Sequence, residues 1–220
     1  MTMPIRVEAY TAGGILTGLI ARTGPLRDAL EGATEVTVES SRWQPLDGSG
    51  EQSAGELRVA VDDLILVVPD EGGGAPVHAQ WHDIDLDAGP YRVRGEMPTM
   101  PGFDPGRALA RPTGEFVLLR DARIELIDRA EGGEASANEL LVNRYAVDRV
   151  EADLMLGFFF PGAAMTVITA PDEPVLPTFT PAVRSPEAGA PAAGSGPADT
   201  ATLAATEDGS PAAETSRPPA

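Results

Sequence analysis

Short runs in which apolar and polar residues alternate occupy much of the first third of the chain. Period-two alternation is typical of strands that bury one face, so the pattern predicts strands at 6–10, 15–21, 35–43 and 56–68. Gly13 and Gly14 lie between the first two runs and predict a β-hairpin there. In the third run the alternation places Val36 and Val38 on one face. Residues 1–70 are therefore expected to form a small β unit.

One short helix is expected inside this unit, at 24–32. Pro25 suits the first turn of a helix, because its fixed φ matches helical geometry and its missing N–H leaves no bond unmade. Leu26, Ala29 and Leu30 then share one face, and Gly32 can end the helix. The helix separates the second expected strand from the third.

The same order of elements recurs after a Gly-rich segment at 71–76. The second series comprises a hairpin at 77–97, a short helix at 104–112, and strands at 115–127 and 139–150. Gly95 stands in its second strand as Gly18 stands in the first series. The order predicts a mostly β fold of two pseudo-repeated small β-barrel or sandwich units, each with one short helix.

The tripeptide Ala-Val-Asp marks a late strand of each repeat, at 60–62 and at 146–148. If the two tripeptides are equivalent, Val61 and Val147 both lie on strands. Period-two alternation then points both valines into a core, and it points Asp62 and Asp148 to solvent.

Composition divides the chain into four parts. Residues 1–70 form the first β unit, 71–76 a linker, 77–170 the second β unit, and 171–220 a tail. The tail holds ten Pro, much Ala, Gly, Ser and Thr, and few large apolar residues. Such a segment buries too little apolar area to offset its ordering entropy, so it is expected to be disordered.

The charge of the chain argues against nucleic-acid partners. Its 220 residues carry a formal net charge of −18, and all 16 basic residues are Arg. An acidic chain repels phosphate backbones. The chain has no Cys, which excludes disulfides, thiolate metal sites and Cys nucleophiles. The N-terminal residues lack the pattern of a secretory leader, so a cytoplasmic location is expected.

One apolar run, 154–170, carries no charge and is interrupted by Pro161-Gly162. A membrane-spanning helix needs about 20 apolar residues. Two buried strands joined by a Pro-Gly turn are therefore expected here. A membrane-associated segment and an oligomer interface remain as alternatives.

Two stretches carry a resemblance to a known family. "VHAQWHDIDLDAGPYRVRGEM" is a strand, turn and strand with Gly95 in the second strand, and "FVLLRDARIEL" continues it. Each repeat resembles an Sm-like small β-barrel, and "PLRDAL" is similar to a short helix that some bacterial proteins place between the second and third strands. The resemblance implies a strongly bent barrel, present twice. The RNA binding that it would also imply is not expected, given the acidic charge.

Candidate chemistry is sparse. His78 and His82 share one strand face while the nearby Asp residues share the other, so they are weak metal candidates and no cofactor is expected. The sequence shows no Gly-x-Ser-x-Gly nucleophile elbow and no phosphate-binding loop. The candidates for an interaction surface are Phe158, Phe159 and Phe160 in the apolar run, and Arg107 and Arg111 on the second helix.

These observations favour a non-catalytic interaction or scaffold module of the bacterial cytoplasm, with a protein partner or self-association. Two alternatives stay open. One is a sensor or enzyme that holds a small ligand between the two units. The other is a membrane-associated component that uses 154–170.

Overall fold

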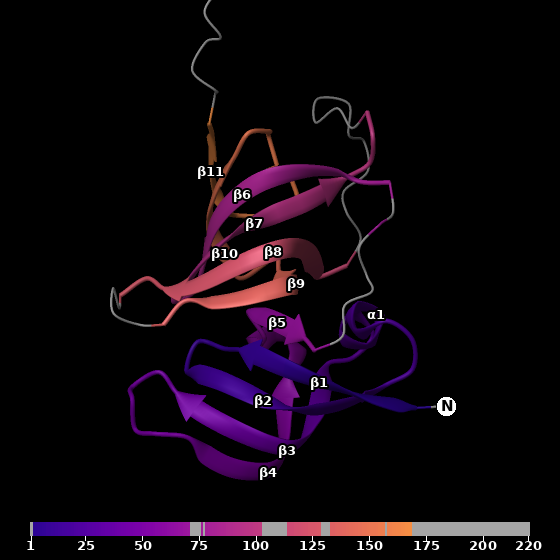
Figure 1. Cartoon of the computed structure of the whole chain (residues 1–220), viewed down its shortest axis with the longest axis vertical. Helices are drawn as coiled ribbons and strands as arrows, with labels where there is room; N and C mark the ends of the chain where they lie inside the picture. The colour runs from indigo at the N-terminus through magenta and orange to yellow at the C-terminus, as the bar shows by residue number, and fades with distance from the viewer. Residues whose placement is uncertain are drawn as a thin grey trace, which may run out of the picture. The chain divides into compact units, whose positions relative to one another are not determined.

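The computed structural model describes residues 2–70, 76, 78–102, 114–128, 133–156 and 158–168. Within them, eleven strands form one sheet, joined by one short α-helix and one 3-10 turn (Figure 1). The expected mostly β fold is confirmed. The expected tail at 171–220 and the helix at 104–112 lie outside the described residues. The elements are β1 (Met3–Tyr10), β2 (Gly14–Arg22), α1 (Leu26–Glu31), β3 (Glu35–Pro45), β4 (Gln52–Ala60), η1 (Val61–Asp63), β5 (Leu66–Pro69), β6 (Gln80–Ala88), β7 (Tyr91–Thr99), β8 (Phe116–Leu126), β9 (Ala135–Asn143), β10 (Val147–Ala152) and β11 (Ala164–Val167).

The strands of the sheet follow the order β11-β10-β6-β7-β8-β9-β5-β1-β2-β3-β4. Every neighbouring pair is antiparallel except β10 and β11, which are parallel. We call β1–β5, with α1 and η1, the first strand set, and β6–β11 the second strand set. In Figure 1, β5 lies between β9 above and β1 below, and its pairing with β9 joins the two sets.

The expected hairpin and helix of the first strand set form as the sequence predicts. β1 and β2 pair in continuous register, from Met3 with Arg22 to Tyr10 with Ile15. Helix α1 has Pro25 at its N-cap position and Gly32 at its C-cap position. The two buried residues of α1, Leu26 and Leu30, pack into the first core.

Two of the expected strands are each broken in two. The run 56–68 forms β4, the turn η1 and β5, because the Val61 amide donates to the Thr34 carbonyl at 3.0 Å and the chain turns toward β1. The run 139–150 likewise forms β9 and β10, with a turn between them where the Arg144 amide donates to the Glu115 carbonyl at 2.9 Å. Neither turn contains Gly or Pro, so the sequence pattern does not mark them.

The expectation that Val61 and Val147 both lie on strands is wrong for Val61, which lies in η1, whereas Val147 begins β10. Both valines are buried, with exposed fractions of 1% and 3%, and Asp62 and Asp148 are exposed, as expected. The two Ala-Val-Asp tripeptides therefore stand in different local structures.

The apolar run 154–170 also departs from expectation. Of its described part, only Ala164–Val167 forms a strand, β11, and that strand is largely exposed. The residues before β11 form turns instead of a first strand, and they bury Leu156 and Phe160 in the second core. No described helix has the length and apolar character needed to cross a membrane.

The pairing pattern of the first strand set recurs in the second. β1–β2, β2–β3, β3–β4 and β1–β5 pair in one set, and β6–β7, β7–β8, β8–β9 and β6–β10 pair in the other. β3 and β8 each have a non-glycine residue of positive φ at their sixth position, Ser40 (50°) and Asp121 (49°). These residues mark the points where both strands bend.

Gly18 of β2 and Gly95 of β7 lie against these bends. A Cβ on Gly18 would stand 2.8 Å from the Glu39 carbonyl oxygen, and one on Gly95 would stand 3.0 Å from the Arg120 carbonyl oxygen. Each glycine lets one bent strand approach its neighbour closely.

Two hydrophobic cores lie within the described residues, one for each strand set. Each core also takes side chains from the other set, so neither is complete without it. The side chains that cross in this way are Phe116, Leu118 and Leu141 in the first core, and Tyr10, Ile65 and Leu66 in the second.

We expect Gly18→Ala to lower the free energy of unfolding by about 2–3 kcal/mol and Gly95→Ala by about 1–2 kcal/mol, because the added methyl forces two backbones apart. Urea denaturation measures both. Gly133→Ala is the control, since a Cβ there meets nothing within 4 Å. Losses at Gly18 and Gly95 no larger than the loss at Gly133 would contradict the close approach.

Candidate functional site

An apolar groove opens beside β4 in the first strand set. Its cavity has a volume of about 780 Å³. Leu57 and Val59 of β4 line it together with Trp43 of β3, and Leu16 and Ile65 close its inner side. The period-two pattern of β4 produces this face, because Leu57 and Val59 alternate with Glu56 and Arg58. We call this cavity the β4 groove.

β4 is the last strand of the sheet at this end. Among the described residues it pairs only with β3, so its outer edge offers backbone N–H and C=O groups to another strand. Gln52, Ser53 and Ala54, at its start, are exposed and also line the groove. The site thus combines an open strand edge with a partly buried apolar surface.

Two carboxylates stand at the rim of the β4 groove. Asp62 and Asp63 belong to the turn η1, and both are exposed. They lie at the end of β4, where an added strand would begin or end. Two adjacent negative charges there favour a cation on whatever occupies the groove.

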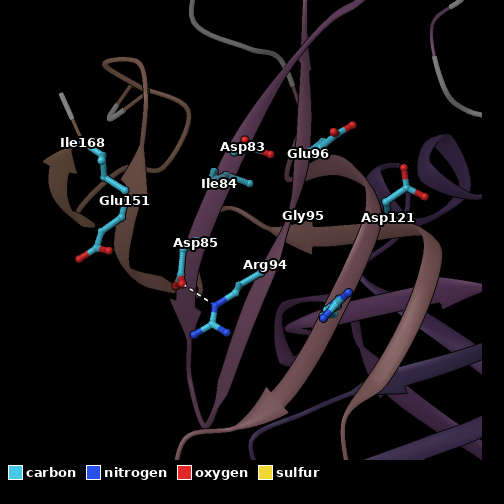
Figure 2. Close-up of a pocket in the computed structure, with 10 residues that line it drawn as sticks. Asp83, Ile84, Asp85, Arg94, Gly95, Glu96, Asp121, Glu151 and Ile168 are labelled. Carbon is cyan, nitrogen blue, oxygen red and sulfur yellow. Dashed lines mark hydrogen bonds and ion pairs between the residues drawn. The ribbon is translucent and has the colours of Figure 1, made fainter. Parts of the chain in front are cut away.

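A second cavity, of about 450 Å³, lies on the second strand set (Figure 2). Acidic side chains dominate its lining: Asp83, Asp85, Glu96, Asp121 and Glu151 face Arg94 and Arg123. Its carboxylates are already engaged in part, since the Arg94 Nε donates to Asp85 at 2.8 Å and Arg120 pairs with Glu96. No group of three or more metal-ligating side chains occurs in the described ranges.

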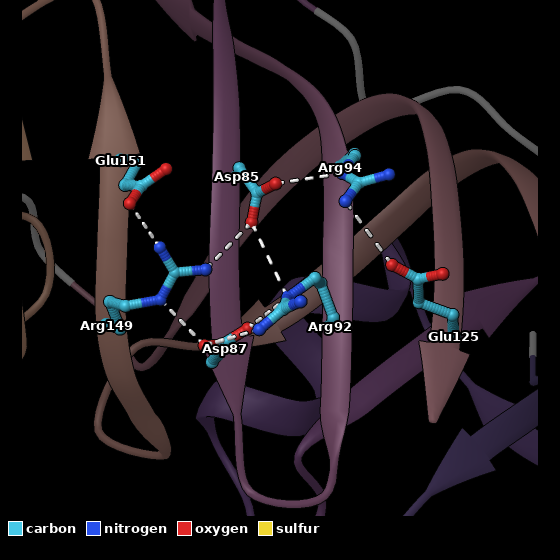
Figure 3. Close-up of polar contacts among 7 residues, drawn as sticks. All are labelled: Asp85, Asp87, Arg92, Arg94, Glu125, Arg149 and Glu151. Carbon is cyan, nitrogen blue, oxygen red and sulfur yellow. Dashed lines mark hydrogen bonds and ion pairs between the residues drawn. The ribbon is translucent and has the colours of Figure 1, made fainter. Parts of the chain in front are cut away.

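Beside this cavity an ion-pair network spans four strands, β6, β7, β8 and β10, with Glu125 of β8 paired to Arg94 (Figure 3). Asp87 of β6 accepts hydrogen bonds from Arg92 Nε at 2.8 Å and from Arg149 Nε at 2.7 Å. Arg149 also reaches Asp85 at 3.3 Å and pairs with Glu151 on its own strand. The sheet register places Asp87 directly opposite Arg92, so the network stabilises the pairing of β6, β7 and β10.

The network sets the protonation of Asp87. The hydrogen bond from Arg92, together with that from Arg149, lowers the pKa of Asp87 to about 2, although burial opposes the shift. The pKa of the Arg149 guanidinium is raised, mainly by its hydrogen bond to Asp87. Each charged group is satisfied by another group of the network. We therefore interpret the network as a structural element of the sheet.

A buried histidine forms a relay that resembles a catalytic arrangement. His82 Nε2 lies 3.0 Å from Thr99 Oγ1, and His82 Nδ1 lies 3.3 Å from Asp153 Oδ2. Hydroxyl, imidazole and carboxylate in this order could activate a nucleophile. However, the Thr99 hydroxyl donates to the Gln80 carbonyl and is 5% exposed, and no cavity described above reaches it. The relay instead fixes the segment after β10 to β6 and β7.

The other residues expected from sequence do not gather into one site. His78 is exposed and takes no part in the relay. Phe158 and Phe159 are partly buried, with ring centroids 4.4 Å apart, and Phe160 is a core residue with 1% exposure. Phe160 is therefore unavailable as a surface contact. Arg107 and Arg111 lie outside the described residues.

Sequence reasoning did not find the β4 groove. The alternation of Leu57 and Val59 was visible, but it predicts only a buried face and not that this face is open. Comparisons with protein-family models, with curated proteins and with solved structures found no match.

We expect Asp87→Asn to lower the free energy of unfolding at pH 7 by roughly 1–2 kcal/mol, since a charged acceptor of two Arg donors is lost. The pKa of Asp87 is lowered from an ordinary value near 4 to about 2. Its stabilisation is therefore complete above about pH 4 and is lost as the pH falls toward 2. Urea denaturation from pH 7 to pH 3 should show the difference between wild type and variant shrinking below pH 4. A difference that is constant over this range would contradict the assignment.

Proposed function

We propose that the chain is a non-catalytic protein-interaction module that binds an extended segment of a partner at the β4 groove. One observation carries the proposal: the outer edge of β4, unpaired among the described residues, lies beside an apolar cavity of about 780 Å³. Strand addition uses these two features together, since main-chain hydrogen bonds supply affinity and side-chain pockets supply specificity.

We also propose that the two strand sets are repeats of one small barrel that resembles the Sm-like fold. The support is the recurrence of the same four pairings, of the bends at Ser40 and Asp121, and of the glycines at Gly18 and Gly95. In this proposal the second repeat is shifted by 77 residues at the glycines and by 81 at the bends. Loop length differences account for the change.

The electrostatic character of the chain suggests the charge of the partner. The net charge is −18, and Asp62 and Asp63 stand at the groove rim. Complementary charge accelerates association and disfavours wrong partners. A segment with an Arg or Lys beside its apolar residues fits best.

A small ligand is the second candidate. Cavities of about 300–1,000 Å³ suit small molecules, and the β4 groove falls within that range. A smaller polar cavity of about 390 Å³ lies where the two strand sets meet, lined among others by Arg6, Glu8 and Glu139. If the protein is a sensor of a small ligand, that ligand would bind in one of these two cavities.

The proposal predicts that extended peptides selected from a display library on the full chain slow amide hydrogen exchange at residues 52–60. Ala54→Arg, on an exposed residue of the groove lining, should abolish binding without a change in thermal stability. Glu56→Gln is the matched control, since it changes the net charge equally at a residue of β4 that does not line the groove. Peptides that bind wild type and Ala54→Arg equally would refute the groove as the site. A thermal shift with metabolites that Ala54→Arg removes, with no peptide selected, would favour the small-ligand candidate.

A further inference from the structure

Under the proposed repeat relation, β9 is the strand of the second set that corresponds to β4, and its outer edge is covered by another strand. β3 pairs Val38 with Leu57 of β4, and β8 pairs Leu119 with Leu140 of β9 at the same distance before the bend. By this register Leu57 corresponds to Leu140. β9 therefore shows what a covered β4 would look like, within the repeat relation proposed above.

The strand that covers β9 is β5. Leu66 pairs with Val142, Val67 pairs with Leu141, and the Asn143 amide donates to the Ile65 carbonyl at 2.9 Å. Ile65 and Leu66 enter the second core, so the covering strand presents large aliphatic side chains to the core beneath it.

The corresponding residues of β4 lack this cover. Leu140 and Val142 have exposed fractions of 0%, whereas Leu57 and Val59 are only partly buried. The difference is the β4 groove itself. An occupant that restores the burial must present apolar side chains at the positions of Ile65 and Leu66.

On the opposite face of the sheet, the side chains beside β4 differ in polarity from those beside β9. Beside β5, the side chains on this face are apolar: Phe116, Leu118 and Leu141. In the same register, the corresponding residues near β4 are Glu35, Thr37 and Arg58. Of these, Glu35 and Arg58 are exposed. An occupant of β4 must therefore be polar on this face.

Among the described strands, the counterpart of β5 in a second copy of this chain does not suit the groove. The strand of the second set that corresponds to β5 is β10, and Arg149 stands there where Leu66 stands in β5. Arg149 is bound to Asp87, which corresponds to Tyr10. Inserting β10 into the groove would bury this ion pair, at a large cost in desolvation. In addition, β11 already pairs with the outer edge of β10.

We infer that the β4 groove takes an extended strand from a different protein, apolar on the side toward Leu57 and Val59 and polar on the side toward Glu35 and Arg58. The inference rests on the proposed interaction function and specifies its partner.

The test uses synthetic peptides made from the chain's own covering strands. The probe has the sequence of residues 61–70 with Val67→Glu, because Val67 faces Leu141 in β9 and would face Arg58 in β4. It also carries Asp62→Lys and Asp63→Lys, which supply the cations that the acidic rim of the groove favours. The control peptide has the sequence of residues 144–153, which carries Arg149 in place of Leu66. Binding to the full chain is followed by hydrogen exchange at 52–60 and by Trp43 fluorescence in a Trp81→Phe background.

We expect saturable binding of the probe, slowed exchange at 52–60, and binding weaker by roughly tenfold or more for the control peptide and for the Ala54→Arg variant. The chain alone should sediment as a monomer at every concentration tested. Equal binding of the two peptides, or no binding of the probe, would overturn the inference. A dimer that forms with concentration and protects 52–60 would make a second copy the occupant instead. If library peptides protect 52–60 while the probe does not bind, the proposed function stands and only this inference fails.

Discussion

The pairing of β5 with β9 is the contact on which the rest of the described structure depends. Among the described residues, it joins the two strand sets into one sheet through two residue pairs and one further backbone hydrogen bond. Its strength lies in the side chains around it, because Phe116 and Leu141 complete the first core while Tyr10 and Leu66 complete the second. Separating the sets would expose apolar surface on both, so each set stabilises the other.

This junction also gives the molecule its asymmetry. Under the proposed repeat relation, the covered edge of β9 corresponds to the edge of β4, which is unpaired among the described residues and is lined by Leu57 and Val59. Under the same relation, the covering strand β5 corresponds to β10, which carries the Arg149–Asp87 ion pair and is covered by β11. The proposed binding function resides at the unpaired edge of β4.

The sequence predicted the local elements well, and the reasons lie in particular residues. Gly13-Gly14, Pro25 and Gly32 act through backbone geometry, and their hairpin and helix form as expected. The turn at Val61–Asp63 was missed because it contains neither Gly nor Pro, although apolar residues flank it on both sides. The sequence also did not predict contacts between residues far apart in the chain. Period-two alternation placed His82 on the strand face opposite its Asp neighbours, but no local pattern indicated that Thr99 and Asp153 are its hydrogen-bond partners. The β4 groove exists because no described strand pairs with the outer edge of β4, and the local sequence of β4 does not indicate which strands will pair with it.

The central claim is that the junction makes the two strand sets one cooperative unit. The chain has two Trp residues, Trp43 on β3 and Trp81 on β6, so each set contains its own fluorescent reporter. Equilibrium urea unfolding followed in Trp43→Phe and Trp81→Phe variants measures each set within the full chain. After correction for the stability change of each substitution, measured by circular dichroism on the same samples, the account predicts one shared transition for both reporters. Two separate transitions, with one set unfolding while the other stays native, would contradict it.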